Sequence, residues 1–215
     1  SLVANACEKI SISPLTIQMC KTRSAVDFHL AYSDGSQLQA QLSGQSQLNS
    51  LKVLNRDRIF SEDLRADTLA ALKSHGNLLD SRYPELKRLL EMTVDMLPTD
   101  EPVPDFSVDA LELFQRARFA GFQTICELIG QSTLARYTSF GETYEKSLFV
   151  GMEDTACRGR CGTNCYQPFQ SAKRQYTREC LNHDLCTDEV GTVFGQCQDE
   201  WVLASDGYLA APECP

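Results

Sequence analysis

Ten cysteines in 215 residues constrain this chain more than any other feature. The number is even, and seven of the ten lie between Cys157 and Cys214. Dense, even-numbered cysteines are typical of a disulfide framework that forms in an oxidising compartment. The sequence therefore predicts a secreted or periplasmic protein. Because it begins at Ser1 with no basic flank or long apolar segment, we expect a signal peptide to have been removed already.

The positions of the cysteines also predict how the chain is organised. Before the dense cluster the chain holds only Cys7, Cys20 and Cys126. Three and seven are both odd numbers, so complete pairing within the chain needs at least one bridge between the two regions. The first two cysteines are close enough to close a local loop, and Cys126 is the candidate for the joining bridge. We predict an N-terminal region of unknown function, residues 1–150, and a cysteine-rich core, residues 151–215.

Charge and hydrophobicity exclude two classes of protein. The chain has 20 Lys and Arg against 29 Asp and Glu, a formal net charge of -9. Such a balance disfavours a nucleic-acid binder that works through a general basic field. No apolar run approaches the roughly 18 residues that a membrane-spanning helix needs. We therefore expect neither nucleic acid as a partner nor a transmembrane segment.

The N-terminal region opens with a pattern typical of strands. Apolar and polar residues alternate over 26–32 and again over 38–42, and the turn residues 33–36 lie between them. This arrangement predicts a β-hairpin. The Gly-, Ser-, Gln- and Asn-rich stretch 43–50 is expected to be a loop.

Helical patterns follow the hairpin. Ser61 is a suitable cap for a helix over 62–75, and Gly76 is its expected end. Further helices are predicted over 84–97, where a proline suits the first turn, and over 108–129. The predicted fold class is mainly α, with a small N-terminal β-hairpin and a disulfide-braced two-helix core at the C-terminus.

The N-terminal region carries no group of residues that predicts chemistry. His29 lies on the polar face of a predicted strand, and His75 lies beside the glycine at which a helix is expected to end. Both are isolated from other candidate catalytic groups. We interpret them as surface or capping histidines.

The strongest functional pattern lies in the cysteine-rich part. Cys180, His183 and Cys186 recur every three residues, which places them in a slanting row along a helix. Bridges through both cysteines would fix the histidine, and Asp184, about 100° further around the helix, would face a neighbouring group. The preceding loop, 157–165, contains glycines and can point main-chain carbonyls at a hard cation.

This Cys-x-x-His-Asp-x-Cys pattern, preceded by a Cys-Gly loop, resembles the active site of the secreted phospholipase A2 family over residues 157–210. In that family the loop carbonyls and the Asp bind calcium, while the His activates a water molecule. The resemblance implies Ca²⁺ as cofactor. Its implied ligands are the main-chain oxygens of Arg160, Gly162 and Asn164 and the carboxylate of Asp184, and the N–H of Gly162 would contact the oxyanion.

The resemblance also implies a second, antiparallel helix with an Asp that holds the histidine. A bridge between Cys186 and Cys197 would pack the two helices in this way. Asp199 would then lie close to His183, with Asp206, two turns further on, as the reserve candidate.

The chain departs from the animal enzymes of the family at several positions. Glu179 stands in place of one of two adjacent cysteines, and Asn164 and Cys165 stand where two loop glycines are usual. A distant, microbial branch is the best fit. The loop-to-helix bridge of the family maps onto Cys161 and Cys180.

The implied activity is calcium-dependent hydrolysis of the sn-2 ester of phospholipids, with His183 as general base, Asp199 as its orienting partner, and a membrane surface or micelle as substrate. Five basic residues and no acidic one lie between Cys157 and Arg178, which would suit anionic head groups, although a solvated basic surface is the slightly favoured interpretation.

The alternative function is a catalytically inactive, phospholipase A2-like binding or toxin module. A zinc site is disfavoured, because the region holds a single histidine. The oligomeric state is not indicated.

Overall fold

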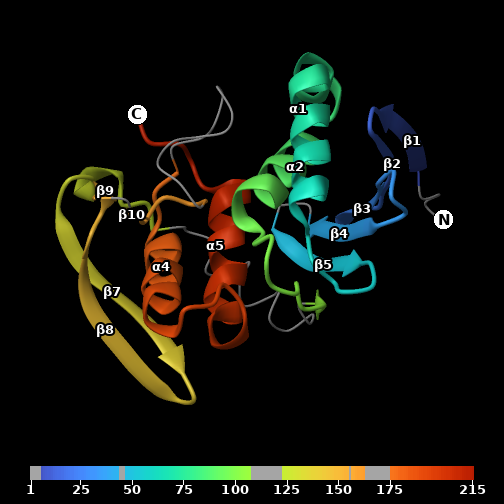
Figure 1. Cartoon of the computed structure of the whole chain (residues 1–215). Helices are drawn as coiled ribbons and strands as arrows, with labels where there is room; N and C mark the ends of the chain where they lie inside the picture. The colour runs from blue at the N-terminus through green and yellow to red at the C-terminus, as the bar shows by residue number, and fades with distance from the viewer. Residues whose placement is uncertain (1–5, 44–46, 108–122, 155, 163–174) are drawn as a thin grey trace. The chain divides into compact units, whose positions relative to one another are not determined.

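The chain divides into two compact units, residues 1–117 and 118–215. Each unit is built from both strands and helices (Figure 1). The functional division near residue 150 stays a prediction. The computed structural model describes residues 6–43, 47–107, 123–154, 156–162 and 175–215.

A five-stranded antiparallel sheet forms the start of the first unit. Neighbouring strands in sequence are neighbours in the sheet, so the topology is a simple meander. A two-residue strand, β6 (Phe106–Ser107), pairs with the last of the five. The five strands are β1 (Ala6–Ile12), β2 (Leu15–Lys21), β3 (Ala25–Ala31), β4 (Gln37–Ser43) and β5 (Leu48–Leu54).

The two faces of this sheet differ in chemistry, because side chains alternate between them along each strand. One face is apolar and fully buried, with Ile17, Phe28 and Leu38 among its residues. Tyr32, which follows β3, lies with its Oη 3.0 Å from the Thr68 Oγ1 of the first helix, so a hydrogen bond joins sheet and helix. The opposite face carries polar side chains.

Two helices complete the described part of the first unit, α1 (Glu62–Arg82) and α2 (Pro84–Met96). The Oγ of Ser61 accepts a hydrogen bond from the N–H of Leu64, which confirms the predicted cap. The predicted end at Gly76 is wrong. The helix kinks at His75 and continues, and its next turn buries a further leucine in the core.

The predicted mainly α fold class is therefore wrong, because the protein is a mixed α/β structure. The β3–β4 hairpin is confirmed, but it is the centre of a sheet and not a small isolated element. The stretch 43–50, expected to be a loop, contains the start of β5. Gln47, just before this strand, and Asn49, within it, are buried although both side chains are polar.

The second unit combines a long hairpin with two helices. Residues 108–122 of the predicted helix over 108–129 lie outside the described part of the chain. The predicted end of this helix is wrong, because Thr124 forms a β-bridge with Thr177 and is followed by a 3-10 turn, η1 (Cys126–Leu128). The sequence patterns also missed the hairpin. The other elements are β7 (Ser132–Ser139), β8 (Glu142–Phe149), β9 (Gly151–Glu153), β10 (Ala156–Arg158), α4 (Arg178–Val190), the 3-10 turn η2 (Gly195–Cys197) and α5 (Gln198–Ala210).

The core of the second unit lies between the hairpin and α4. Tyr137 of β7, Leu148 of β8 and Leu181 and Leu185 of α4 are buried in one apolar cluster. A hydrogen bond also joins the hairpin to α4, because the main-chain N–H of Arg136 donates to the side-chain oxygen of Asn182 at 2.9 Å.

Four disulfides join described residues, and Cys157 is disulfide-bonded as well. The local bridge and the joining bridge predicted from cysteine parity are both present, as Cys7–Cys20 and Cys126–Cys214. Such a framework is typical of an extracellular protein. Within the described residues no helix is long and apolar enough to cross a membrane. The remaining two bridges are Cys161–Cys180 and Cys186–Cys197.

Candidate functional site

The helix α4 is fixed at both ends by its own sequence. The Oγ1 of Thr177 accepts a hydrogen bond from the N–H of Cys180 at 3.1 Å, which caps the first turn. Gly191 ends the helix in the left-handed conformation, with φ 80°. The predicted break at this glycine is confirmed.

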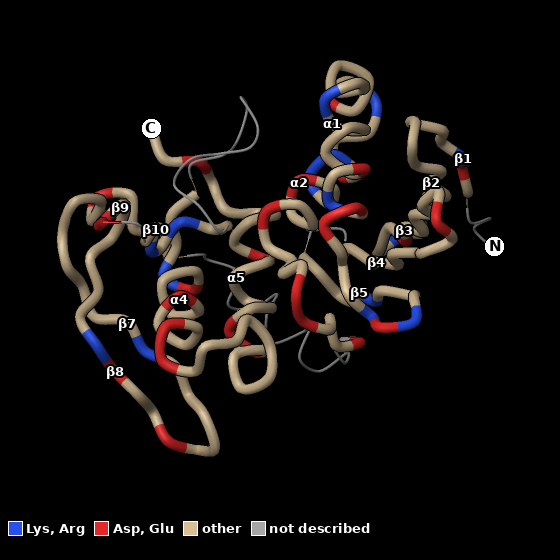
Figure 2. The backbone as a smooth tube through the Cα atoms, in the orientation of Figure 1, with Lys and Arg blue, Asp and Glu red and all other residues tan. Residues whose placement is uncertain are grey.

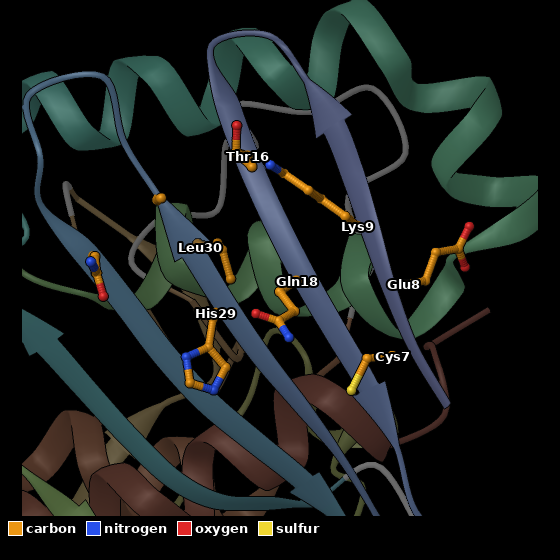
Figure 3. A pocket seen from close by; sticks show the side chains of 9 residues that line it. Cys7, Glu8, Lys9, Thr16, Gln18, His29 and Leu30 are labelled. Atoms are coloured by element: carbon orange, nitrogen blue, oxygen red, sulfur yellow. The ribbon is translucent and has the colours of Figure 1, made fainter. Parts of the chain in front are cut away.

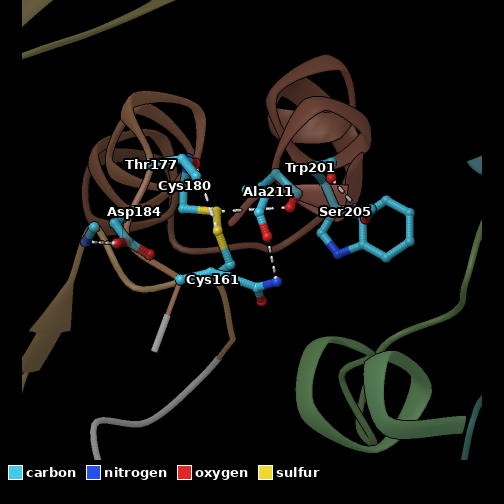
Figure 4. The surroundings of a disulfide bond; sticks show 10 residues. Cys161, Thr177, Cys180, Asp184, Trp201, Ser205 and Ala211 are labelled. Carbon is cyan, nitrogen blue, oxygen red and sulfur yellow. Dashed lines mark hydrogen bonds between the residues drawn. A yellow bond between two sulfur atoms is a disulfide. The ribbon is translucent and has the colours of Figure 1, made fainter. Parts of the chain in front are cut away.

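The helices α4 and α5 run antiparallel. At one end the Cys186–Cys197 bridge joins the last turns of α4 to the start of α5. At the other end Gly207 of α5 packs so closely that an added Cβ would lie 3.0 Å from the Oγ1 of Thr177. The Cys161–Cys180 bridge also ties the preceding loop to the first turn of α4 (Figure 4). His183 therefore lies on a helix that is held covalently on both sides of it.

His183 is partly buried, and its ring has one hydrogen-bond partner among the residues that the structure describes. The Nε2 atom lies 3.3 Å from the main-chain oxygen of Val193, in the connection between the two helices. Because a carbonyl only accepts, Nε2 carries the proton and Nδ1 keeps a free lone pair. Burial lowers the pKa of the imidazole to about 4, although the bond to Val193 opposes this shift. The ring is thus a neutral base with a defined tautomer.

We expect ¹⁵N NMR of the full chain to show this tautomer directly. The Nε2 signal of His183 should have the chemical shift of a protonated ring nitrogen, and the Nδ1 signal that of an unprotonated one, because only Nε2 has an acceptor beside it. The exposed His29 serves as the control and should show rapid exchange between tautomers. An Nδ1-protonated His183 would contradict the observed bond.

Asp184 lies beside His183 and turns its carboxylate toward the loop. Its Oδ2 accepts a hydrogen bond from the N–H of Gly159 at 2.6 Å (Figure 4). Its Oδ1 has no hydrogen-bond partner among the residues that the structure describes. Burial raises the pKa of this carboxyl to about 8, and Asp188 adds to the shift, while the Gly159 bond and Arg158 oppose it. A partly buried carboxyl group with one open oxygen becomes a suitable ligand for a cation when it is ionised.

Gly159 makes this contact possible, because its backbone has φ 79° and almost no space for a side chain. An added Cβ would lie 3.1 Å from the Cδ1 of Ile125 and 3.3 Å from the Cγ1 of Val150. Only glycine adopts such a conformation readily. The sequence patterns did not single out this residue.

Replacing Gly159 with Ala is expected to lower the free energy of unfolding by about 2–3 kcal/mol, from backbone strain and overpacking together. Gly191→Ala is the matched control, because Gly191 has nearly the same φ, 80°, but no atom within 4 Å of an added Cβ. It should cost about 1 kcal/mol. Urea unfolding measures both values, and equal losses would show that packing at Gly159 is unimportant.

The other predicted calcium ligands lie on the same loop. Arg160 pairs with Tyr176 as an isolated bridge, and Gly162 has φ 118°, while Asn164 lies outside the described residues. No group of three or more His, Cys, Asp and Glu that could hold a metal occurs in the described part of the chain. A cation here would depend on one carboxylate and on main-chain oxygens, and such a donor set fits calcium.

In the described part of the chain no hydrogen bond joins Asp199 to the ring of His183. Asp199 is exposed in the first turn of α5, and Asp206 is buried near the other end of that helix. Among the described residues, the Val193 carbonyl is the only hydrogen-bond partner of the His183 ring. The carbonyl therefore occupies the place that the resemblance gives to a carboxylate. No sequence signal identifies it, because every residue has a carbonyl.

The described basic residues beside the site form ion pairs or hydrogen bonds within the protein, or are buried. The Nε of Arg158 lies 2.9 Å from the Oδ2 of Asp188, and Arg178 donates to the carbonyl of Leu134 at 2.6 Å. Arg160 is buried. The helix α4 itself carries four acidic residues and one basic residue (Figure 2). The two other basic residues, Lys173 and Arg174, lie outside the described part.

Comparison of the chain with models of protein families, with curated proteins and with solved structures finds no match.

Proposed function

We propose that this protein is a calcium-dependent hydrolase of the sn-2 ester of phospholipids, with a site similar to that of secreted phospholipases A2. The observation that supports this most is the geometry of α4. Two disulfides hold the helix on either side of His183, and the adjacent Asp184 directs its carboxylate to the N–H of Gly159 in the loop. The protein would act outside the cytoplasm, as a secreted or periplasmic enzyme.

His183 is the general base in this proposal. Its Nδ1 accepts a proton from the attacking water, while the bond from Nε2 to the Val193 carbonyl holds the ring in place. Its depressed pKa keeps the imidazole in the neutral form that a base requires. The water oxygen then bonds to the ester carbon, the bond from that carbon to the glycerol oxygen breaks, and Nδ1 returns the proton to this oxygen, so that a fatty acid and a lysophospholipid leave without a covalent enzyme intermediate.

The remaining residues bind the cation and the developing charge. Asp184 and the main-chain oxygens of Arg160, Gly162 and Asn164 would hold calcium. When bound, calcium supplies Lewis-acid polarisation of the ester carbonyl. The N–H of Gly162 would donate a hydrogen bond to the oxyanion.

A second candidate function is an inactive binding or toxin module with the same braced helices. One observation favours it: His183 donates to a carbonyl, and the predicted orienting carboxylate of Asp199 is exposed. A carbonyl holds the ring, but it stabilises an imidazolium less than a carboxylate does.

Fatty-acid release from mixed phosphatidylcholine and phosphatidylglycerol vesicles distinguishes the two functions. The enzyme proposal expects release with calcium and none with a chelator, from protein whose cysteines are all oxidised. Absence of release under both conditions, from folded protein, would contradict the enzyme and favour the binding module. Release that persists in chelator would contradict the calcium requirement.

A further inference from the structure

The polar face of the first unit contains a pocket that the proposed hydrolysis does not use. Its volume is about 490 Å³, which is within the range of small-molecule sites. The strand pairing aligns Lys9 of β1, Gln18 of β2 and His29 of β3 in one cross-strand row. Figure 3 shows these three side chains and Thr16 on the same face. The lining residues are Cys7, Glu8, Lys9, Thr16, Gln18, His29, Leu30, Ala31 and Gln37.

The pocket is lined by two basic side chains, Lys9 and His29, and by one acidic side chain, Glu8. Within the described residues Lys9 forms no ion pair and His29 no hydrogen bond. Glu8 also lines the pocket, but its Oε1 accepts a hydrogen bond from the Oη of Tyr83 at 2.5 Å and lies 3.8 Å from Arg82. The negative charge of Glu8 is therefore compensated away from the lysine.

Another acidic group on this face also has a hydrogen-bond partner. Asp27 of β3 lies two residues before His29, and its Oδ1 accepts a hydrogen bond from the Nε2 of Gln41 at 2.7 Å. A cationic lysine and a histidine thus remain for an anionic group. They are two strand spacings apart, or about 10 Å, so one ligand of moderate size can contact both.

The neutral lining favours a ligand with hydroxyl groups. Thr16, Gln18 and Gln37 each donate and accept hydrogen bonds, as hydroxyls do. No Phe, Tyr or Trp side chain is among the described residues that line the pocket. A ligand here is recognised by polar contacts.

We propose that this pocket binds a small anion rich in hydroxyl groups, a sugar acid or a sugar phosphate. Lys9 and His29 contact its carboxylate or phosphate, and the threonine and glutamines contact its hydroxyls. The N-terminal unit thereby acquires a binding role of its own, independent of ester hydrolysis in the second unit. His29 is then a ligand-binding residue and not an isolated surface histidine.

Titrations of the ¹⁵N-labelled full chain with galacturonate, glucose 6-phosphate and glucose test this proposal. We expect at least one of the two anions to shift the NMR signals of β1, β2 and β3, and glucose to shift none of them. The difference between the two anions tells whether carboxylate or phosphate is preferred. Added salt should weaken the binding, because it screens the charge on Lys9.

Lys9→Gln is expected to weaken the binding about tenfold, since it removes a charged contact but keeps a long polar side chain. Lys52→Gln is the matched control. Lys52 lies in the same cross-strand row on β5 but outside the pocket, and it is paired with Asp105 at 2.8 Å. Its replacement should leave the affinity unchanged. The proposal is overturned if neither anion shifts these signals, if glucose binds equally well, or if both variants lose affinity equally.

Discussion

Replacing His183 with Gln is expected to lower the rate of fatty-acid release by about 100- to 10,000-fold, the usual contribution of a general base. The glutamine amide can still donate a hydrogen bond to the carbonyl of Val193, so the connection between the helices is retained. It cannot take a proton from water. The variant therefore separates the chemical role of the ring from its structural role.

Activity is measured on phospholipid vesicles with calcium, and unfolding in urea and the number of free thiols are measured on the same samples. His75→Gln, in α1 of the first unit, is the control and should keep the wild-type rate. A folded, fully oxidised His183→Gln protein that works at the wild-type rate would exclude His183 as the base. That result would not support the inactive binding module either, because the protein would still hydrolyse phospholipid.

Asp184→Asn should abolish the response to calcium while the fold stays intact. The asparagine oxygen can still accept the hydrogen bond from Gly159, and the change removes a carboxyl group whose ionisation is opposed by burial, which raises its pKa to about 8. Without calcium we expect the variant to be at least as stable as the wild type. Saturating calcium should stabilise only the wild type, by about 2.7 kcal/mol when its concentration is 100 times Kd. Vesicle hydrolysis should fall about 100-fold or more.

Thermal unfolding with and without calcium provides a readout that does not depend on activity. Glu189→Gln is the control, because Glu189 is an exposed acidic residue of the same helix that pairs with Lys146 of β8 and not with the loop. It should keep both the calcium response and the activity. Equal stabilisation of Asp184→Asn and wild type by calcium would place the cation elsewhere.

The elements that the sequence predicted correctly are those with local signals. The β3–β4 hairpin shows clean alternation, and Ser61, Pro84 and Gly191 mark helix ends. The strand β5 was missed because its buried positions include Asn49, whose amide donates to Gln41 on the neighbouring strand at 3.2 Å. A buried polar residue that bonds to a neighbouring strand looks like a loop residue in the sequence alone.

The hairpin β7–β8 was missed for a related reason. The inward positions of β7 include the small residues Ala135 and Ser139, so its alternation is weak in hydrophobicity. The burial of β7 comes from α4, which lies more than 40 residues later in the chain. Tertiary packing of this kind is not contained in a local pattern.

The candidate site was predictable in its order but not in its details. The loop, the His-Asp helix, the break and the second helix follow one another as expected, and both predicted disulfides of the helix pair are present. The position of Asp199 was not predictable from helical periodicity, because the 3-10 turn η2 precedes α5 and winds at a different rate. The role of the Val193 carbonyl depends on the path of that connection and not on the identity of the residue.

The Cys126–Cys214 bridge makes the completion of the second unit depend on the final cysteine of the chain. The two residues are 88 positions apart, with the hairpin and both helices between them. Cys126 can therefore pair with its native partner only after the residues up to Cys214 have been synthesised. A chain cut short before Cys214 would hold nine of the ten cysteines. Such a fragment necessarily keeps one unpaired thiol, which exposes it to mixed disulfides and covalent dimers in an oxidising compartment.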